Sequence, residues 1–427
     1  MASIIINDEF RNAFDTMEHS GTDIFLTGKA GTGKSTLLTY FRKNTLKNVA
    51  VLAPTGVAAL NVRGQTIHSF FGFKPNVTLS KVRKLSEEDP KVLIVQKLDT
   101  IIIDEVSMVR ADLLDCVDKF LRLNGRDSEQ PFGGIQMIFI GDLYQLPPIV
   151  SYAEKEYFST LYPSPYFFDA HVIQQTNLTL LELTTVYRQK DPAFIEILNA
   201  IRSSQISRNH LTLLNARFDS TYQLDPEQLS MYLTTTNARA KEVNDEHLSR
   251  LSGIPHEVAG TVEGTFEEKD LPTDRTLGLK EGAQVMCIAN DPAGNFVNGT
   301  VGKVLGWDKE GVQVKLDTGK ICVIEKYTWE MFRYSVGKDG GLTTETLGTF
   351  RQIPLKLAWA VTIHKSQGKT FERVVIDLER GTFAHGQLYV ALSRCTSLEG
   401  MVLKTIVKPG HIRLDRAVVE FLEGMKQ

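Results

Sequence analysis

The stretch Gly28-Lys29-Ala30-Gly31-Thr32-Gly33-Lys34-Ser35 decides the fold, because its glycines, lysine and serine have the spacing of a phosphate-binding loop. It follows the apolar run 24–26 and precedes a helical-looking segment that begins at Thr36. The glycines let successive backbone N–H groups point at a phosphate, and the positive end of the following helix adds to the attraction. Lys34 is placed to reach the β- and γ-phosphates, and the Ser35 hydroxyl is placed to ligate Mg²⁺. We therefore predict that the chain binds a nucleoside triphosphate, with contacts from Gly28, Ala30, Gly31, Thr32, Gly33, Lys34, Ser35 and Thr36.

Length and composition limit what the triphosphate is used for. A chain of 427 residues is long enough for two or three domains with sizeable cores. Its 48 basic and 51 acidic residues leave a formal charge of −3, so any contact with nucleic acid must come from local placement of charge. The cysteines are scattered without a Cys-x-x-Cys pair, which favours reduced thiols and gives no metal site. Residues 1–6 lack a basic start and no long apolar span follows, so we expect a soluble, cytoplasmic protein without a targeting segment.

The first 185 residues alternate short apolar runs with amphipathic segments, which predicts a parallel sheet covered by helices. A helix is expected between the third and fourth runs, because Leu113, Leu114, Val117, Phe120 and Leu121 fall on one face. Ligands of such sheets bind just past the carboxyl ends of the strands. The expected strands are 23–27, 48–53, 100–104, 136–141 and 178–183.

Two further motifs follow expected strands. The run 101–103 ends in Asp104 and Glu105, which suits a Walker B site: Asp104 can hold the Mg²⁺ water shell, and Glu105 can orient and deprotonate the attacking water. Gln145 lies in the segment 141–148, where its amide can hold that water or sense the γ-phosphate. An exposed acidic pair and a polar turn before Pro-Pro are the alternatives for these two motifs.

Together with the segment 362–368, Thr-Ile-His-Lys-Ser-Gln-Gly, these motifs resemble those of superfamily-one DNA helicases. The resemblance is strongest to the Pif-one family, and the RecD group comes next. The segment 183–189 resembles the signature of the Pif-one family. It implies an α/β fold of two RecA-like parallel-sheet motor domains that close on ATP, without long terminal extensions. The implied limits are 1–187 for the first motor domain, and 188–295 with 350–427 for the second.

In that family an arginine from the second domain reaches across to the nucleotide. Arg188 and Arg394 match, and the chemistry requires a guanidinium to stabilise charge on the transferring γ-phosphoryl group. The alternative is a pair of solvated charges at helix ends. The resemblance also implies that Gln367 and Gly368 lie on the second-domain wall of the ATP cleft. The family's adenine-reading Gln has no counterpart in the segment 7–10, so hydrolysis is predicted and adenine selectivity is not.

DNA contacts are predicted mainly from the resemblance. Past the second strand, a backbone turn and helix start suit either a DNA phosphate or a simple helix cap. A histidine followed by Phe70 and Phe71 is by itself typical of a core, and only the family match favours a DNA contact for the histidine. The residues implied are Thr55, Gly56, His68, Thr234, Asn237, Thr362, His364 and Lys365.

Two insertions interrupt the motor pattern. Residues 296–349 contain short apolar runs separated by Glu310-Gly311 and 317–319, which predicts a small antiparallel barrel. Similar helicases carry a Src-homology-three-like barrel inserted in the second motor domain. Its alternatives are a clamp over DNA and a structural plug. The segment 72–97 interrupts the first domain and is expected to supply a strand-separating wedge.

These observations predict an ATP- and Mg²⁺-dependent DNA helicase, and the resemblance implies 5′-to-3′ movement on single-stranded DNA. Single-strand/duplex junctions are expected partners, and four-stranded DNA is left open. We expect a monomer without membrane contact, with a DNA-induced dimer as the alternative. Two other functions stay open: a RecD-type subunit of a nuclease complex, and an ATP-gated clamp on single-stranded DNA that does not unwind.

Overall fold

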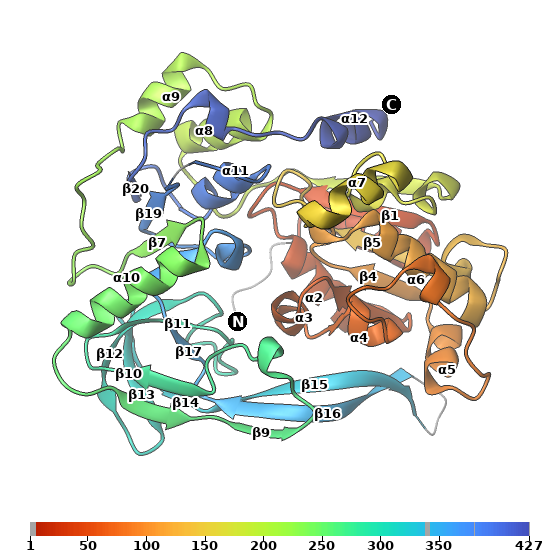
Figure 1. Cartoon of the computed structure of the whole chain (residues 1–427), viewed down its shortest axis with the longest axis horizontal. Helices are drawn as coiled ribbons and strands as arrows, with labels where there is room; N and C mark the ends of the chain where they lie inside the picture. Colours follow the sequence, from red (N-terminus) through yellow and green to blue (C-terminus); the bar gives the residue numbers. More distant parts are fainter. Residues whose placement is uncertain (1–5, 338–341, 380, 427) are drawn as a thin grey trace. The chain divides into compact units, whose positions relative to one another are not determined.

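The computed structural model describes residues 6–337, 342–379 and 381–426, which form two compact units (Figure 1). The first unit comprises Ala2–Tyr187, Met331–Leu347 and Asp415–Gln427. The second unit comprises Arg188–Glu330 and Gly348–Leu414, together with Met1, which is outside the described residues. Residues 331–347, part of the predicted insert, thus group with the first unit, and the domain limits derived from sequence stay predictions.

The first unit is built on a six-stranded sheet in the order β3-β2-β4-β5-β1-β6, in which each strand pairs in parallel with its neighbours. The five strands expected from the sequence are present, and their ends differ from expectation by no more than one residue. Because β1 lies beside β5 and β5 beside β4, the loops that follow these three strands are neighbours. The strands are β1 Asp23–Gly28, β2 Val49–Ala53, β3 Gln65–Thr66, β4 Thr100–Ile103, β5 Gln136–Ile140 and β6 Leu178–Leu183.

Helices cover both faces of this sheet. Because successive strand residues point to opposite faces, Ile102 packs into the core under α1 and α2, whereas Ile101 and Ile103 pack into the core that contains α6. The predicted apolar face of α6 is buried in full. The helices of the first unit are α1 Asp8–His19, α2 Lys34–Asn44, α3 Gly56–Asn61, α4 Ile67–Phe71, α5 Pro90–Lys97, α6 Ala111–Asn124, α7 Tyr152–Leu161 and α12 Arg416–Gly424.

The second unit has its own parallel sheet, in the order β18-β7-β19-β20. Its register places Thr362 of β18 and Asp377 of β19 on either side of Thr234 of β7, so the ends of these three strands meet at one edge. The strands are β7 Met231–Thr234, β18 Ala360–Thr362, β19 Val374–Asp377 and β20 Met401–Leu403. The helices are α8 Pro192–Arg202, α9 Arg208–Asn215, α10 Asn237–Arg250 and α11 Gln387–Leu392.

The predicted barrel strands form an antiparallel five-stranded sheet, in the order β14-β13-β12-β11-β17. Two of its strands, β11 and β17, lie outside residues 296–349, so the sheet also uses chain that flanks the predicted insert. The strands are β11 Gln284–Cys287, β12 Val301–Trp307, β13 Gly311–Leu316, β14 Ile321–Glu325 and β17 Leu355–Leu357. A two-stranded pair joins β8 His256–Ala259 and β10 Thr276–Leu279, and a three-stranded sheet joins β9 Thr261–Gly264, β15 Tyr327–Val336 and β16 Leu342–Gln352.

Short 3-10 helices complete the described chain, and they span Leu79–Lys81, Val106–Met108, Pro131–Gly134, Phe167–Asp169, Ile173–Gln175, Glu268–Asp270, His364–Ser366 and Pro409–His411. Among the described residues no helix combines the length and the apolar character needed to cross a bilayer. Residues 1–5, on which the expectation about a targeting segment partly rests, lie outside that description.

The part of β15 that belongs to the first unit is fixed to the sheet edge by specific contacts. The Tyr334 hydroxyl accepts the backbone N–H of Val51 at 3.0 Å, and the Gln65 side chain donates to the Phe332 carbonyl at 2.7 Å. The Tyr334 ring meets Phe70 edge to face, with ring centroids 5.7 Å apart. Through these contacts of Phe332 and Tyr334, the end of β15 becomes part of the hydrophobic core of the first unit.

Replacing Tyr334 with Phe keeps the ring and removes the oxygen that accepts the Val51 N–H. The buried N–H loses its partner, so we expect the free energy of unfolding of the first unit to fall by about 1–3 kcal/mol. Urea unfolding followed by circular dichroism measures this change. The control is Ser335→Ala, which removes from the same strand a hydroxyl whose hydrogen bond to Thr343 is exposed to solvent, and it should cost less than about 0.5 kcal/mol. Equal losses in the two variants would contradict the assignment.

Candidate nucleotide site and nucleic-acid interface

The phosphate loop adopts a backbone that only glycine tolerates easily. Gly31 and Gly33 have φ of +83° and +93°, and Gly33 is the N-terminal cap of α2. At Gly28 the chains approach so closely that a Cβ atom would lie 2.6 Å from the Leu183 carbonyl oxygen. The loop therefore holds a turn of inward-facing backbone directly before the N-terminus of α2, where an anion is favoured.

Lys34 lies across this loop. Its Nζ donates to the carbonyls of Gly28 at 2.6 Å and Lys29 at 3.1 Å, while the Thr32 hydroxyl donates to the Lys29 carbonyl at 3.0 Å. Its positive charge also acts on Asp104 at the end of the neighbouring motif. The lysine predicted to bind phosphate is thus held within the loop by main-chain oxygens, which a phosphate can replace as acceptors.

The acidic pair follows β4. Asp104 is 8% exposed, and burial raises its pKa, the nearby charge of Glu105 raises it further, and Lys34 offsets part of this shift. Glu105 has φ of +52°, a left-handed conformation that is costly for a non-glycine residue and typical of functional turns. Burial and the neighbouring negative charge disfavour the charged form of the Asp104 carboxylate, and a bound cation would stabilise it.

Ser35 and Asp104 carry oxygen donors of the chemical type that binds Mg²⁺ beside a nucleotide. Among the described residues no group of three or more His, Cys, Asp or Glu side chains can hold a metal by itself. Mg²⁺ normally takes one or two protein oxygens and fills its remaining positions with phosphate oxygens and water. The Ser35 hydroxyl and Asp104 are the residues here that would hold it.

The segment after β5 packs against the acidic motif. A Cβ atom on Gly141 would lie 3.1 Å from the backbone nitrogen of Val106, so the two loops touch. Gln145 and Asp142 are both buried, and the Gln145 amide donates to the Asp142 carboxylate at 3.3 Å. The predicted third motif is therefore brought to the acidic pair, with the Gln145 amide fixed by an acidic neighbour.

The end of β6 and the start of α1 also meet at the phosphate loop. The Tyr187 N–H donates to the Gly31 carbonyl at 2.9 Å, and the Tyr187 hydroxyl accepts from the Asn7 side chain at 3.3 Å. The Thr184 hydroxyl donates to Glu9 and lowers the pKa of that carboxyl. The sequence analysis missed Tyr187 as a neighbour of the loop, because nothing local links it to a glycine more than 150 positions away in the chain.

In the second unit, Arg188 and Arg394 converge on the motif that contains Gln367 and Gly368. Arg188 donates to the Gly368 carbonyl at 3.1 Å and to the Ser393 carbonyl at 3.2 Å, and burial lowers its pKa. Arg394 is 1% exposed and donates to the Val390 carbonyl at 2.9 Å and to the carbonyls at 366 and 369. Arg394 is therefore not a solvated helix-end charge, and both predicted arginines belong to one cluster within this unit.

In the first unit, the predicted DNA residues follow β2 and β3. The Thr55 hydroxyl accepts the Ala58 N–H at 3.2 Å and so caps α3, with Gly56 half-buried at the first position of that helix. His68 is half-buried in α4, while Phe70 and Phe71 are buried in the core as the sequence predicts. Capping of the helix and binding of a DNA phosphate would both use the N-terminus of α3. Both alternatives for Thr55 therefore stay open.

In the second unit, the predicted residues gather at the carboxyl edge of the sheet. Thr234 and Thr362 are adjacent across β7 and β18, and Asn237 begins α10. The Thr362 hydroxyl accepts the Lys365 N–H at 3.3 Å. This edge therefore presents hydroxyls, an amide and the 3-10 helix of His364 side by side.

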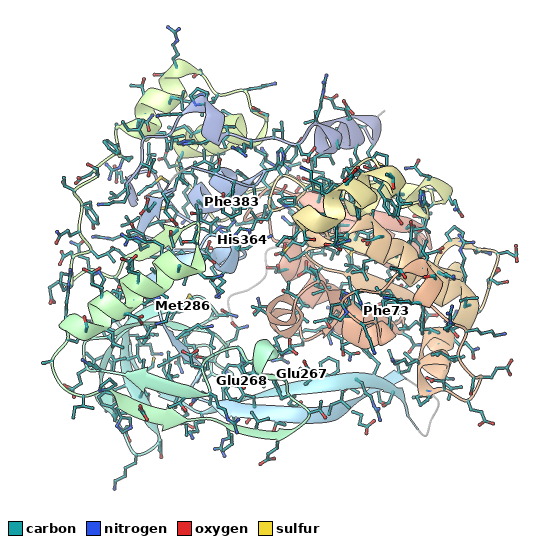
Figure 2. All side chains as sticks on the ribbon, in the orientation of Figure 1. Phe73, Glu267, Glu268, Met286, His364 and Phe383 are labelled. Carbon is teal, nitrogen blue, oxygen red and sulfur yellow. The ribbon has the colours of Figure 1, made fainter. Side chains whose placement is uncertain are left out.

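His364 has an aromatic neighbour that the sequence analysis did not single out. Its ring stacks on Phe383 with centroids 5.9 Å apart and planes 12° apart, and Figure 2 shows the two side chains together. Phe383 is 59% exposed, which is unusual for a large apolar ring, and burial lowers the pKa of His364. A lone Phe in a loop carries no sequence signal, so only its position beside His364 reveals it.

Local positive charge lies near the same motif. Burial, together with the charge of Lys356, lowers the pKa of Lys369 to about 8. Burial also lowers the pKa of Lys356, and Lys365 contributes to that shift in the same direction. Lys356 thus has a second lysine charge close to it, and this local positive charge favours an anion, although the chain as a whole is slightly acidic.

The profile of the PIF1-like helicase family matches residues 5–211. The human ATP-dependent DNA helicase PIF1 is 34% identical over 422 residues, which cover 95% of this chain and 62% of the human protein. The ATP-dependent DNA helicase Pif1 of Bdellovibrio bacteriovorus is 30% identical over 426 residues, which cover 98% of this chain and 92% of that protein. This chain belongs to the PIF1-like helicase family. It spans about three fifths of the length of the human relative.

Solved structures of the family share the fold. Pif1 from Bacteroides sp in complex with ADP-AlF4 is 36% identical and has a TM-score of 0.91, with 99% of this chain and 98% of that chain covered. Bacteroides Pif1 bound to ssDNA has a TM-score of 0.72 at 36% identity, over 99% of this chain and 98% of that chain. The two-motor α/β architecture with RecA-like sheets, predicted from the motifs, is thereby confirmed.

Lys34→Ala removes the ammonium group that lies over the phosphate loop. We expect ATP hydrolysis to fall by about 10²-fold or more, the usual cost of losing one donor to a transferring group. A coupled assay of phosphate release measures turnover. The matched control is Lys43→Ala, an exposed lysine in the last turn of the same helix, which should keep wild-type turnover. Retention of a tenth of wild-type turnover by Lys34→Ala would contradict the assignment.

Proposed function

We propose that this chain is an ATP-dependent DNA helicase that moves 5′ to 3′ on single-stranded DNA and unwinds duplexes. The observation that carries the proposal is the meeting of three motifs at one sheet edge, after β1, β4 and β5. This edge offers a phosphate cradle, a buried acidic pair and a buried amide, which are the parts of an ATP-hydrolysing motor. Membership of the PIF1-like family supports the helicase assignment.

The residues of the first unit have separable roles in hydrolysis. The loop backbone and Lys34 bind the phosphates, while Ser35 and Asp104 would hold Mg²⁺, which supplies positive charge at the phosphates when bound. Glu105 orients and deprotonates the attacking water, and Gln145 positions that water. The resemblance to the family supports Arg188 and Arg394 as the groups that neutralise developing charge from the second unit.

The second unit supplies DNA contacts of two kinds. Hydroxyls and the start of α10 suit backbone phosphates, whereas the exposed Phe383 ring suits stacking on a base. The Bacteroides sp protein of the same family binds ssDNA in its crystal structure, which supports single-stranded DNA as the partner here. We propose a monomer as the active unit. A DNA-induced dimer is the alternative to the monomer, and four-stranded DNA is a further candidate substrate. Binding measurements in solution test both.

A strand-displacement assay tests the proposal directly. The substrates are one duplex with a 5′ single-stranded tail and the same duplex with a 3′ tail, each with a fluorophore and quencher on opposite strands. We expect ATP-dependent separation of the 5′-tailed substrate alone. Separation of the 3′-tailed substrate alone would overturn the direction. ATP-dependent binding without separation of either substrate would favour the clamp function instead.

Glu105→Gln separates catalysis from binding. The amide keeps the shape of the side chain and loses its basicity, so we expect ATP hydrolysis to fall by about 10²-fold or more while ATP and single-stranded DNA affinities stay within about twofold. Fluorescence anisotropy with a labelled ATP analogue and a labelled oligonucleotide measures the two affinities beside phosphate release. A parallel loss of ATP affinity would make Glu105 a structural residue of the loop.

Phe383→Ala tests the stacking residue. Loss of one aromatic platform costs about 1–3 kcal/mol, or roughly 5- to 150-fold in Kd for single-stranded DNA. Basal, DNA-free hydrolysis should stay at the wild-type value, because Phe383 is not among the predicted ATP contacts. The control is Phe218→Ala, which removes another exposed ring of the same unit. Equal losses in the two variants would show that unit stability, not stacking, was lost.

A further inference from the structure

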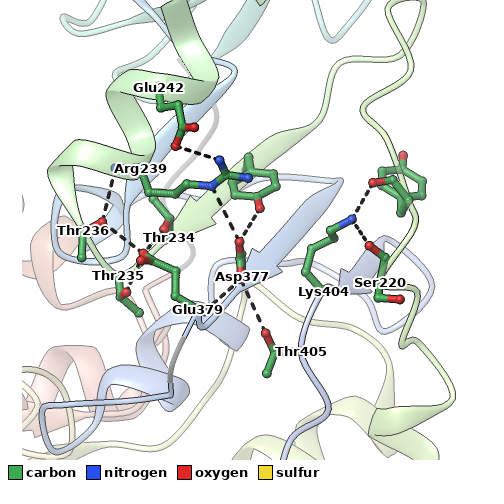
Figure 3. Close-up of polar contacts among 12 residues, drawn as sticks. Ser220, Thr234, Thr235, Thr236, Arg239, Glu242, Asp377, Glu379, Lys404 and Thr405 are labelled. Carbon is green, nitrogen blue, oxygen red and sulfur yellow. Dashed lines mark hydrogen bonds and ion pairs between the residues drawn. The ribbon is translucent and has the colours of Figure 1, made fainter. Parts of the chain in front are cut away.

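The three threonines at the end of β7 already bind an anionic oxygen in this structure. The hydroxyls of Thr234, Thr235 and Thr236 donate to one carboxylate oxygen of Glu379, at 2.6, 2.7 and 3.1 Å (Figure 3). Glu379 comes from the loop after β19, more than 140 residues further along the chain. The arrangement places a single Oε1 atom at the focus of three consecutive hydroxyls.

The same groups are suited to a phosphate of the DNA backbone. Nucleic-acid phosphates are commonly bound by Ser and Thr hydroxyls and by the N-termini of helices. Thr236 is the N-terminal cap of α10, a helix of 14 residues, and its hydroxyl also accepts the Arg239 N–H at 3.3 Å. The oxygen of Glu379 therefore occupies the kind of position that a non-bridging phosphate oxygen would take.

The loop holds Glu379 in this place. Its φ is +50°, and its N–H donates to the Asp377 carboxylate at 2.8 Å. Asp377 in turn accepts from the Tyr232 hydroxyl at 2.5 Å, and Figure 3 shows these contacts within one network. Burial would raise the pKa of Glu379, but the threonine hydroxyls outweigh it and lower the pKa, which keeps the carboxylate charged.

The contact is nevertheless open to exchange. Glu379 is exposed, so rotation about its side-chain bonds can move the carboxylate into solvent without unfolding any element. Thr234 and Thr235 are buried and stay in place. A DNA phosphate that arrives at this edge must displace the carboxylate, because two negative oxygens cannot share the same donors.

We propose that Glu379 is an internal competitor of the DNA backbone, which occupies the threonine donors and sets the affinity of the second unit for single-stranded DNA. This inference rests on the proposed function, since it requires that the edge of β7 binds DNA. A competitor that fills the donors most of the time weakens the apparent affinity in proportion to the fraction of open sites. Removing it therefore tightens binding without adding any contact to DNA.

The experiment compares Glu379→Ala and Glu379→Gln with the wild-type chain by fluorescence anisotropy on a labelled oligothymidine at low and moderate salt. We expect Kd to fall by about 5- to 10-fold in Glu379→Ala, as for a site otherwise occupied 80–90% of the time. Glu379→Gln keeps the shape and an acceptor oxygen but loses the charge, so a smaller gain is expected. It also serves if Glu379→Ala folds poorly.

Two controls separate competition from a general change of charge. Glu246→Gln removes the same charge from the exposed face of α10, where Glu246 pairs with Arg250, and should change Kd by less than about twofold because surface charges are screened. Thr235→Val in the Glu379→Ala background should cancel the gain, since the freed hydroxyls are its cause. Persistence of the gain without the Thr235 hydroxyl would overturn the proposal.

The outcomes also distinguish this inference from the function on which it rests. Wild-type chain that binds no single-stranded DNA at low salt would overturn the proposed function. Wild-type chain that binds, together with Glu379 variants that bind equally or more weakly, would overturn the competitor alone. If the Glu379 variants bind single-stranded DNA more weakly than the wild-type chain, the Glu379 carboxylate orients the threonine hydroxyls for DNA and does not compete with DNA.

Discussion

Parallel pairing of β1 between β5 and β6 is the constraint on which the site depends. Parallel strands end at the same edge of a sheet, so their following loops meet there whatever the length of chain between them. The register then sets how closely they meet: Gly28 is opposite Leu183, and the approach is too tight for a side chain at Gly28. The phosphate loop is thereby fixed to the end of β6 as well as to its own helix.

That attachment continues into the second unit through the covalent chain. Tyr187 donates its N–H to the Gly31 carbonyl, and the next residue, Arg188, donates to the Gly368 and Ser393 carbonyls. One peptide bond thus links a residue bound to the phosphate loop with a residue bound to the motif of Gln367 and Gly368.

The sequence was sufficient wherever a motif follows a short apolar run. The strands before Gly28 and Asp104 were predictable because buried parallel strands are continuously apolar and their ligand loops follow at once. The contacts of Tyr334 and Glu379 were not predictable, because each joins segments far apart in the chain. The contact of Phe383 with His364 was not predictable because a single Phe in a loop is an ordinary residue type without a motif. The grouping of residues 331–347 with the first unit has the same cause: a regular hairpin pattern does not say which core it packs against.

A net charge of −3 is a further physical constraint on a protein proposed to move along DNA. The edge of the second sheet offers mostly uncharged donors and a carboxylate that accepts from the threonine hydroxyls, and burial lowers the pKa of Lys356 and Lys369. Such a surface binds each phosphate less tightly than a row of free arginines would. Weak individual contacts suit a motor, because every step along the strand must break the contacts that the previous step made. A strongly basic channel would raise affinity and, for the same reason, slow release.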